Sequence, residues 1–174
     1  IEGLKIINPK VLQDTRGYFF ESWNKESFRK HGIDANFVQD NQSLSSKGVI
    51  RGLHFQNPPF DQGKLVRVIK GSVLDVAVDI RKKSPTYGQH VAIELNEKNK
   101  TMLWIPPGFA HGFSTLEDNT ILSYKCSGIY NQESEDALLW NDPDLNINWQ
   151  INTPVISEKD QRAQQFCTFK SLFI

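Results

Sequence analysis

The segment LVRVIKGSVLDVAVDI, residues 65–80, decides the fold, because apolar residues alternate with polar ones on both sides of a turn. Successive side chains of a strand point to opposite faces, so this alternation predicts strands at 65–69 and 73–80. Lys70-Gly71-Ser72 supplies the turn between them. We therefore predict that the two strands form a β-hairpin.

The second of these strands has one apolar face and one acidic face. The apolar face carries Leu74, Val76, Val78 and Ile80. Asp75 and Asp79 lie on the opposite face, with Ala77 between them. We expect the apolar face to pack in the core, and the acidic face to be partly solvated or to pair with Arg67 or Arg81.

The period-two pattern extends along most of the chain, with turn signals between the runs, which is typical of an all-β sandwich or barrel. Residues 4–12 are predicted to form a first strand, and its Asn8-Pro9 interruption indicates a sheet edge that can pair with another subunit. Helix is the minority element. We predict a short helix, KESFRKH, after an Asn24 cap and another from the Ser157 cap through 161–166.

Length and composition favour one domain that spans residues 1–174. The 20 basic and 20 acidic residues balance to a net charge of zero, which argues against nucleic acid or an anionic membrane as a partner. No apolar run is long enough for a membrane helix, and residues 1–10 lack the pattern of a signal peptide, so we predict a cytoplasmic protein. Cys126 and Cys167 have no metal-type spacing and are predicted to be buried thiols.

The polar residues of GVIRGLHFQNPPFDQGK, residues 48–64, predict a functional site. The polar positions around its short apolar run are Arg51, His54, Gln56, Gln62 and Lys64. In an extended segment one face holds Gly52, His54 and Gln56, and the other holds Leu53 and Phe55. A lone histidine is usually only hydrogen-bonded, but here Arg51 and Lys64 add fixed positive charge that suits an anionic ligand.

Three further positions could carry chemistry, and each also has an ordinary structural explanation. His111 lies between two glycines directly after a predicted strand, where a ligand or another backbone could approach closely. Tyr124 falls in a predicted strand, where a tyrosine usually packs in the core or an interface. Asp160 completes the capping box SEKD, and its carboxylate could contact another group as well.

Taken together, the segments resemble one family, the dTDP-4-keto-6-deoxyglucose 3,5-epimerases, also called dTDP-4-dehydrorhamnose 3,5-epimerases. The matching motifs are collinear over nearly the whole chain: DTRGYFFE, FVQDNQS, GVIRGLHFQ, QGKLVRV, GSVLDVAVDIRKKSPTYGQ, LWIPPGFAHGF, YKCSGIY, LLWNDP and SEKD. Such a series is far more specific than any single motif. The resemblance implies a cupin-type β jelly roll (a double-stranded β-helix) with a few short helices, and a homodimer that exchanges strands at its interface.

The resemblance also implies roles for residues that fall on the family's motifs. His54 would be the general base, Asp160 the carboxylate that orients it, and Tyr124 the acid on the opposite face of the sugar. Lys64 would stabilise the enolate oxygen, and Tyr130 would stack on the thymine ring. The positions implied to contact the nucleotide sugar are Arg16, Glu21, Gln39, Asn41, Arg51, His111, Glu135 and Lys159.

These residue types suit the implied reaction, epimerisation of a dTDP-4-keto-6-deoxyhexose at carbons 3 and 5 in deoxysugar biosynthesis of the dTDP-L-rhamnose type. Inverting a carbon beside a ketone requires removal of its proton, a held enolate and return of a proton from the other face. Histidine, with an unperturbed pKa of about 6.5, suits the base, and tyrosine, near 10, stays protonated. A lysine cation stabilises the developing oxyanion, so no redox or metal cofactor is expected.

One alternative lies within the family, where some members invert carbon 3 alone. Residue identity does not distinguish them, because the choice of carbon depends on fine placement of the acid. The chain departs from the family pattern at residues 57–60, where Asn-Pro-Pro-Phe forms an apolar loop, and at Cys126. These departures could tune the fit of the substrate without removing the reaction.

Two other classes of protein share part of this pattern: metal-dependent cupin enzymes and non-catalytic sugar-binding modules. The spacing Pro106-x-Gly108-x-x-His111 resembles half of a metal-binding cupin pattern, but Gln56 stands where a second histidine would follow His54. A non-catalytic sugar-binding module could keep the two cations of the 48–64 segment. It would have no use for a base, a carboxylate and an acid as a set.

Overall fold

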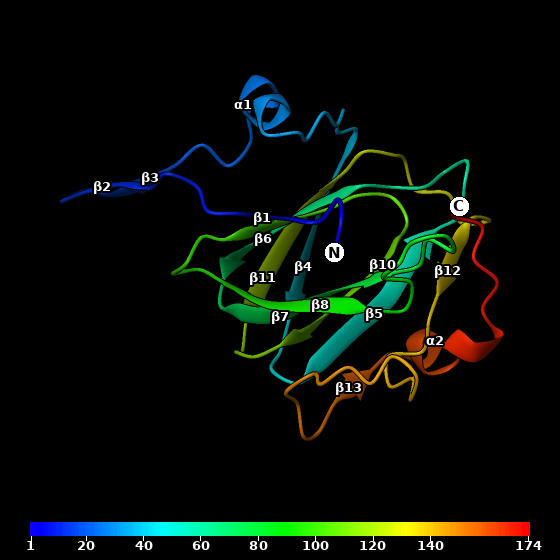
Figure 1. Cartoon of the computed structure of the whole chain (residues 1–174). Helices are drawn as coiled ribbons and strands as arrows, with labels where there is room; N and C mark the ends of the chain where they lie inside the picture. Colours follow the sequence, from blue (N-terminus) through cyan, green and yellow to red (C-terminus); the bar gives the residue numbers. More distant parts are fainter.

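The computed structural model describes residues 1–174, and most of the chain folds into two β-sheets that face each other (Figure 1). The five-stranded sheet has the order β1 (Lys5–Ile7), β9 (Met102–Ile105), β6 (Lys64–Lys70), β11 (Thr120–Cys126) and β4 (Gln39–Ser45). The six-stranded sheet has the order β12 (Glu135–Ala137), β5 (Val49–Gln56), β10 (Phe109–Thr115), β7 (Ser72–Asp79) and β8 (His90–Asn96), with β13 (Val155–Ile156) parallel to β5.

The remaining elements are short. β2 (Leu12–Asp14) and β3 (Gly17–Phe19) form a separate hairpin, which extends away from the two sheets in Figure 1. The helices are α1 (Lys25–Lys30), α2 (Glu158–Gln161) and a 3₁₀ turn, Phe166–Thr168. None of these helices has the length and apolar character needed to cross a membrane.

Apolar residues fill the space between the sheets and also cover their outer faces. The inner cluster joins Val66, Leu103 and Leu122 of the smaller sheet to Val73, Ala77 and Phe113 of the larger one. Outside the larger sheet, residues of the C-terminal segment, among them Leu145, Trp149 and Phe173, cover the apolar face of β7. Outside the smaller sheet, Phe28 of α1 packs near Trp104. The molecule is therefore an all-β jelly roll, as the sequence predicts.

The predicted hairpin at residues 65–80 is wrong, although both strands exist. β6 pairs with β9 and β11, whereas β7 pairs with β8 and β10, so the two strands belong to different sheets. The chain crosses between sheets at Gly71, whose φ of +80° suits glycine, and where a Cβ atom would lie 2.3 Å from Oγ1 of Thr120. Both edges of β6 and both edges of β7 are paired with other strands. Alternation of apolar residues therefore identified the two strands but not their partners.

The acidic face of β7 lies inside the jelly roll and is fully buried, not partly solvated. Asp79 pairs with Arg81, as one of the predicted alternatives, at 2.7 Å. Asp75 pairs with His111 instead of an arginine, at 3.0 Å. Burial of a carboxylate is costly unless it is paired, so both partners are needed for this face to enter the interior.

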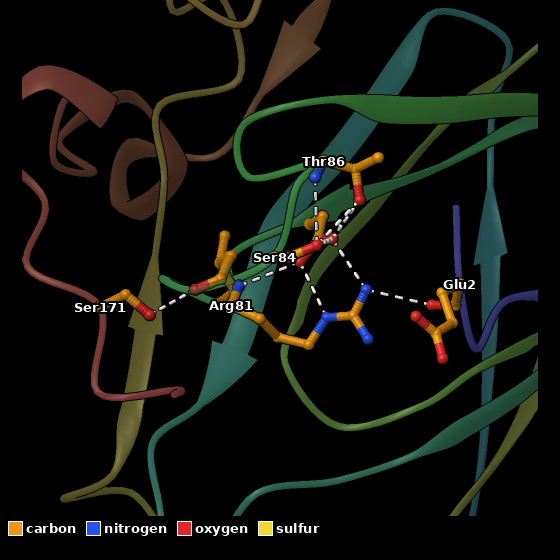
Figure 2. A network of polar contacts seen from close by, with 7 residues as sticks. Glu2, Arg81, Ser84, Thr86 and Ser171 are labelled. Atoms are coloured by element: carbon orange, nitrogen blue, oxygen red, sulfur yellow. Dashed lines mark hydrogen bonds and ion pairs between the residues drawn. The ribbon is translucent and has the colours of Figure 1, made fainter.

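The Asp79 carboxylate is the acceptor in a network of polar contacts at one end of the fold, and Figure 2 labels Glu2, Arg81, Ser84, Thr86 and Ser171 of this network. The carboxylate accepts hydrogen bonds from the Arg81 guanidinium and from the hydroxyls of Ser84 and Thr86. Arg81 also donates to the backbone oxygen of Glu2, and Ser171 donates to the Ile80 carbonyl. Burial opposes ionisation of Asp79, but these hydrogen bonds outweigh it and lower its pKa to about 2. The network joins both ends of the described chain to β7.

Other local predictions are partly confirmed. Asn24 caps α1 through a bond from the Ser27 amide, at 3.1 Å, and β1 lies at a sheet edge. The predicted first strand is shorter, because β1 ends before Pro9, and the second helix stops at Gln161. Cys126 is buried as predicted, but Cys167 is exposed.

Candidate active site

β5 carries the predicted base, and an irregularity in this strand decides which side chains face inward. Opposite β10, His54 pairs with His111 but Arg51 pairs with Phe113, so β5 contains one residue more than its partner between these points. Leu53 packs in the outer core together with Ile50, so the strict alternation stops between them. Arg51 consequently lies on the side of His54, and its Nε donates to Oγ of Ser45, at 3.2 Å.

Two glycines allow the strands to approach closely at this irregularity. A Cβ atom on Gly52 would lie 2.5 Å from Cα of Gly112, and one on Gly112 would lie 2.7 Å from the Arg51 oxygen. Both distances are too short for a real side chain. The sequence predicted that a ligand or another backbone could approach closely near His111, and the structure shows the backbone of β5 there.

His54 is held by a carboxylate from the C-terminal segment. Its Nε2 lies 2.7 Å from Oδ1 of Asp160, and the Gly52 amide donates to Oδ2 of the same carboxylate, at 3.4 Å. Ser157 caps α2 by accepting from the Asp160 amide, so the helix start fixes the position of this residue. Asp160 is only 3% exposed; burial opposes its ionisation, but its hydrogen bonds outweigh this effect, so its pKa lies below the ordinary value.

The opposite wall of the site comes from the five-stranded sheet. Tyr124 of β11 and Lys64 of β6 face inward, and Lys64 Nζ lies 6.0 Å from the centroid of the Tyr124 ring. Burial raises the pKa of Tyr124 and lowers that of Lys64. The same Nζ donates to the backbone oxygen of His54, at 3.4 Å, so the lysine reaches across to the wall that carries the histidine.

A cavity of about 290 Å³ lies between these walls. Its lining residues are Gln39, Asn41, His54, Phe55, Gln56, Gln62, Lys64, Tyr124, Tyr130 and Glu135. At its mouth the Tyr130 hydroxyl donates to Oε2 of Glu135, at 2.9 Å, and Lys159 Nζ lies 2.5 Å from the same oxygen. The hydrogen bond to Glu135 raises the pKa of Tyr130, which is half exposed.

His111 lies beside the cavity and does not line it. Its Nε2 lies 3.0 and 3.1 Å from the two oxygens of Asp75, and its ring faces Tyr124 at a centroid distance of 6.4 Å. Sequence reasoning missed Asp75 as its partner. The alternation of β7 did place Asp75 on one face, but only the pairing of β7 with β10 brings it to His111.

Two predicted site residues lie away from the cavity within one chain. Arg16 is exposed at the turn of the β2–β3 hairpin and pairs with Asp14, at 2.5 Å. Glu21 accepts from Asn24, at 3.0 Å, and borders a different cavity of about 640 Å³ beside β1 and α1. The other predicted site residues either line the cavity, border its mouth or support its walls.

Comparisons of the sequence and of the fold with known proteins all indicate the same family. Residues 1–168 match the family model of dTDP-4-dehydrorhamnose 3,5-epimerase. The chain belongs to this family. Its relative from Shigella flexneri, named dTDP-4-dehydrorhamnose 3,5-epimerase, is 49% identical over 167 residues, which cover 95% of this chain and 92% of the relative.

Solved structures of epimerases share the fold, which confirms the predicted cupin-type jelly roll. The dTDP-6-deoxy-D-glucose-3,5-epimerase of Legionella pneumophila, in complex with dTDP-4-keto-L-rhamnose, matches with a TM-score of 0.94 and 46% identity, covering 98% of this chain and 91% of that one. A 3'-monoepimerase from Streptomyces bikiniensis, in complex with dTDP-quinovose, matches with a TM-score of 0.92 and 34% identity, covering 97% and 86%. The backbone fold of this epimerase is thus shared by enzymes that invert different numbers of carbons.

The metal-binding alternative predicts several ligands around one point. In the structure no three or more His, Cys, Asp or Glu residues gather closely enough to hold a metal ion. His54 and His111 are each bound to a different carboxylate, and the Gln56 side chain is hydrogen-bonded to backbone groups of Phe60, Ile129 and Asn131.

Proposed function

We propose that this epimerase inverts carbons 3 and 5 of dTDP-4-keto-6-deoxyglucose through enolate intermediates, in biosynthesis of the dTDP-L-rhamnose type. One observation carries the proposal: a carboxylate-bound His54 on one sheet faces Tyr124 and Lys64 on the other, across a cavity of about 290 Å³. A sugar ring between the walls would have a base on one side and a proton donor on the other.

His54 removes the proton next to the ketone. The ionised Asp160 bound to one ring nitrogen fixes the orientation of the imidazole, and it stabilises the imidazolium that forms when the proton arrives. Because the pKa of Asp160 lies below its ordinary value, this carboxylate stays negative at neutral pH.

Lys64 and Tyr124 complete the reaction on the other wall. Lys64 donates a hydrogen bond to the enolate oxygen, where its charge is effective because little water reaches this depth. Tyr124 returns a proton from the face opposite His54. Burial raises the pKa of Tyr124, so the phenol is held in its protonated, donating form.

The mouth of the cavity binds the dTDP group. Tyr130 offers a half-exposed ring for stacking on thymine, and Lys159 and Arg51 supply positive charge for the diphosphate. The remaining proposed contacts to the nucleotide sugar come from Gln39, Asn41, His111 and Glu135.

We further propose a homodimer in which the β2–β3 hairpin of each protomer completes the site of its partner. Tyr18 and Phe19 are 55% and 69% exposed on this hairpin, which is unusual for large apolar side chains on a short projecting element. Arg16, at its turn, is paired with Asp14 and does not line the cavity of its own chain. A hairpin that docks on a second copy buries the two rings and brings Arg16 and Glu21 to the partner's cavity.

The location proposed is the cytoplasm, and the proposed reaction uses no cofactor. The two cysteines are both unpaired, which fits a reducing compartment. Acid and base side chains are sufficient for the two inversions, so we expect full activity after extensive treatment with a chelator.

The experiment that tests the function incubates the protein with dTDP-4-keto-6-deoxyglucose in D₂O and identifies the products by NMR. We expect deuterium at carbons 3 and 5, and dTDP-L-rhamnose after addition of the downstream ketoreductase. Inversion confined to carbon 3 would instead assign the chain to the monoepimerases. An unchanged substrate would contradict the proposed function.

A further inference from the structure

The peptide group that joins Ile129 to Tyr130 is held at both ends by glutamine side chains. Nε2 of Gln56 donates to the Ile129 oxygen, at 3.2 Å, and the Tyr130 amide donates to Oε1 of Gln39, at 2.9 Å. The two glutamines come from different sheets, because Gln56 ends β5 and Gln39 begins β4. The peptide plane that precedes the Tyr130 ring is therefore fixed from both sides.

Gln56 uses its whole amide for contacts of this kind. The side chain is 5% exposed, and Nε2 also donates to the Phe60 oxygen, at 2.6 Å. Its Oε1 accepts from the Asn131 amide, at 2.9 Å. Only one orientation of the amide satisfies two carbonyls and one N–H, so the assignment of its oxygen and nitrogen follows from its partners. Although Gln56 lines the cavity, its donors are already occupied by backbone.

The contacts of Gln56 link two loops at the mouth of the cavity. One loop, residues 57–63, follows β5, and the other, residues 127–131, follows β11. Phe60 belongs to the first loop and is 46% exposed, while Ile129 and Tyr130 of the second are 69% and 52% exposed. Neither loop gains much from burying its side chains, so hydrogen bonds restrain them. Gln62 and Gly63 bond directly to Gly128 and Ser127, and the buried Gln56 amide restrains the part of the second loop that leads into Tyr130.

We propose that Gln56 is a positioning residue, which holds the Ile129–Tyr130 peptide so that the Tyr130 ring is preorganised for the nucleobase. This inference rests on the proposed stacking role of Tyr130. In this proposal Gln56 contacts neither the nucleobase nor the reacting carbons of the sugar. It lowers the cost of ordering the aromatic ring when the ligand binds, so its effect belongs to binding and not to proton transfer.

The test measures dTDP affinity by calorimetry, and kcat and KM, for Gln56→Leu, Tyr130→Leu and the double variant. Leucine fills a similar volume and removes every hydrogen bond of the amide. We expect Gln56→Leu to weaken dTDP binding and to raise KM by about tenfold, with kcat within about twofold of the parent. In the Tyr130→Leu background the same change should have little further effect, because no ring remains to be positioned.

Gln161→Leu is the matched control. This exposed glutamine also donates to a backbone oxygen, that of Ile156, at 3.1 Å, but it has no contact with the loops at the mouth. Its dTDP affinity should equal that of the parent. Melting temperatures of all variants show whether any loss of affinity follows from partial unfolding.

The possible outcomes separate this inference from the proposed function. If Tyr130→Leu weakens dTDP binding but Gln56→Leu does not, or if the two effects add, the positioning role is wrong and the stacking role stands. If Tyr130→Leu has no effect, the stacking role fails and the positioning role fails with it. Should Gln56→Leu not fold, amide exchange in the parent decides: a slowly exchanging Asn131 amide, which donates to Oε1 of Gln56, supports the restraint by Gln56, and a freely exchanging one overturns it.

Discussion

His54 depends for its orientation on Asp160, which lies 106 positions away in the chain. The carboxylate is buried, and its place is fixed by the start of α2 and by the Gly52 amide. Since only the imidazole takes the proton, the two residues contribute unequally to the proposed chemistry.

We therefore predict different losses for the two members of this pair. His54→Asn should lower solvent-deuterium exchange into the substrate by about 10²–10⁴-fold, because the base itself is removed. Asp160→Asn should cause a loss roughly tenfold smaller, since the amide oxygen can still accept from the ring, although the bond from the Gly52 amide is lost. Exchange is measured by NMR in D₂O. Equal and mild losses from both changes would contradict the assignment.

For Tyr124 we predict that exchange and inversion separate. Tyr124→Phe removes the proposed donor and leaves the ring that packs beside His111. His54 can still remove a proton and return it to the original face. The variant should take up deuterium at near parental rate while forming less than about 1% of the inverted sugar.

Three results are informative for this variant. Inversion of both carbons at the parental rate would show that Tyr124 is not the acid. Simultaneous loss of exchange and inversion, with dTDP binding retained, would show that Tyr124 is required to form the enolate. Either result would overturn the two-wall assignment, whereas a selective loss of inversion supports it.

At the residue level, the sequence identified the types and positions of the site residues better than their contacts. The resemblance placed His54, Lys64 and Tyr124 at one site, and the structure brings them around one cavity. Asp75 was missed as the partner of His111, because cross-strand contacts follow from sheet pairing, which period-two alternation does not specify.

At the level of elements, the alternation of apolar residues predicted where strands run but not which strands pair. The clearest example is residues 65–80. The turn at Gly71 is of a kind that is common in hairpins, but here it leads the chain from one sheet into the other. The extra residue in β5 was also not predicted. It turns Arg51 to the side of His54, and Gly52, a glycine inside the strand, was the sequence signal that could have indicated it.

The Asp79 network permits a prediction about stability. Asp79→Asn should lower the free energy of unfolding at pH 7 by about 2 to 4 kcal/mol, because the partly buried Arg81 would lose its carboxylate partner, and the buried site would lose the charge that Arg81, Ser84 and Thr86 bind. The folded-state pKa, about 2, lies below the unfolded value of 3.8, so ionised Asp79 stabilises the fold fully above about pH 4. This contribution is lost as the pH falls toward 2.

Urea unfolding at several pH values tests the prediction. The difference between the parent and Asp79→Asn should shrink as the pH is lowered from 4 to 2. Glu26→Gln, which breaks the exposed pair with Arg29, is the control and should cost less than about 0.5 kcal/mol. A difference that does not depend on pH would show that the network does not depend on the charge of Asp79.

At the scale of the whole molecule, the fold class was predictable because alternation and collinear motifs both report on the whole chain. The oligomeric state is harder to predict from the sequence. Apolar residues of the β2–β3 hairpin are compatible with a solvent-exposed surface and with a subunit interface, and the sequence pattern is the same in both cases. Complementation between variants addresses this question directly.

We predict that two inactive variants restore activity when mixed. Arg16→Ala removes the residue donated to the partner, and His54→Asn removes the base of the receiving site. After subunit exchange, half of the molecules should be heterodimers with one intact site, so activity should recover to about a quarter of the parental value. Light scattering should give twice the chain mass of 19.9 kDa. Recovery that fails in a proven dimer would place Arg16 in its own chain's site or in neither.

The position of α2 in the chain has a consequence for the order in which the protein becomes competent during its synthesis. All the strands, and with them His54, Lys64 and Tyr124, precede α2. A chain growing on the ribosome therefore presents the proposed base, the lysine and the proposed acid before Asp160 has been translated. Both walls can assemble around the future cavity while the imidazole still lacks its carboxylate, so catalytic competence is acquired last, when the final segment docks on β5.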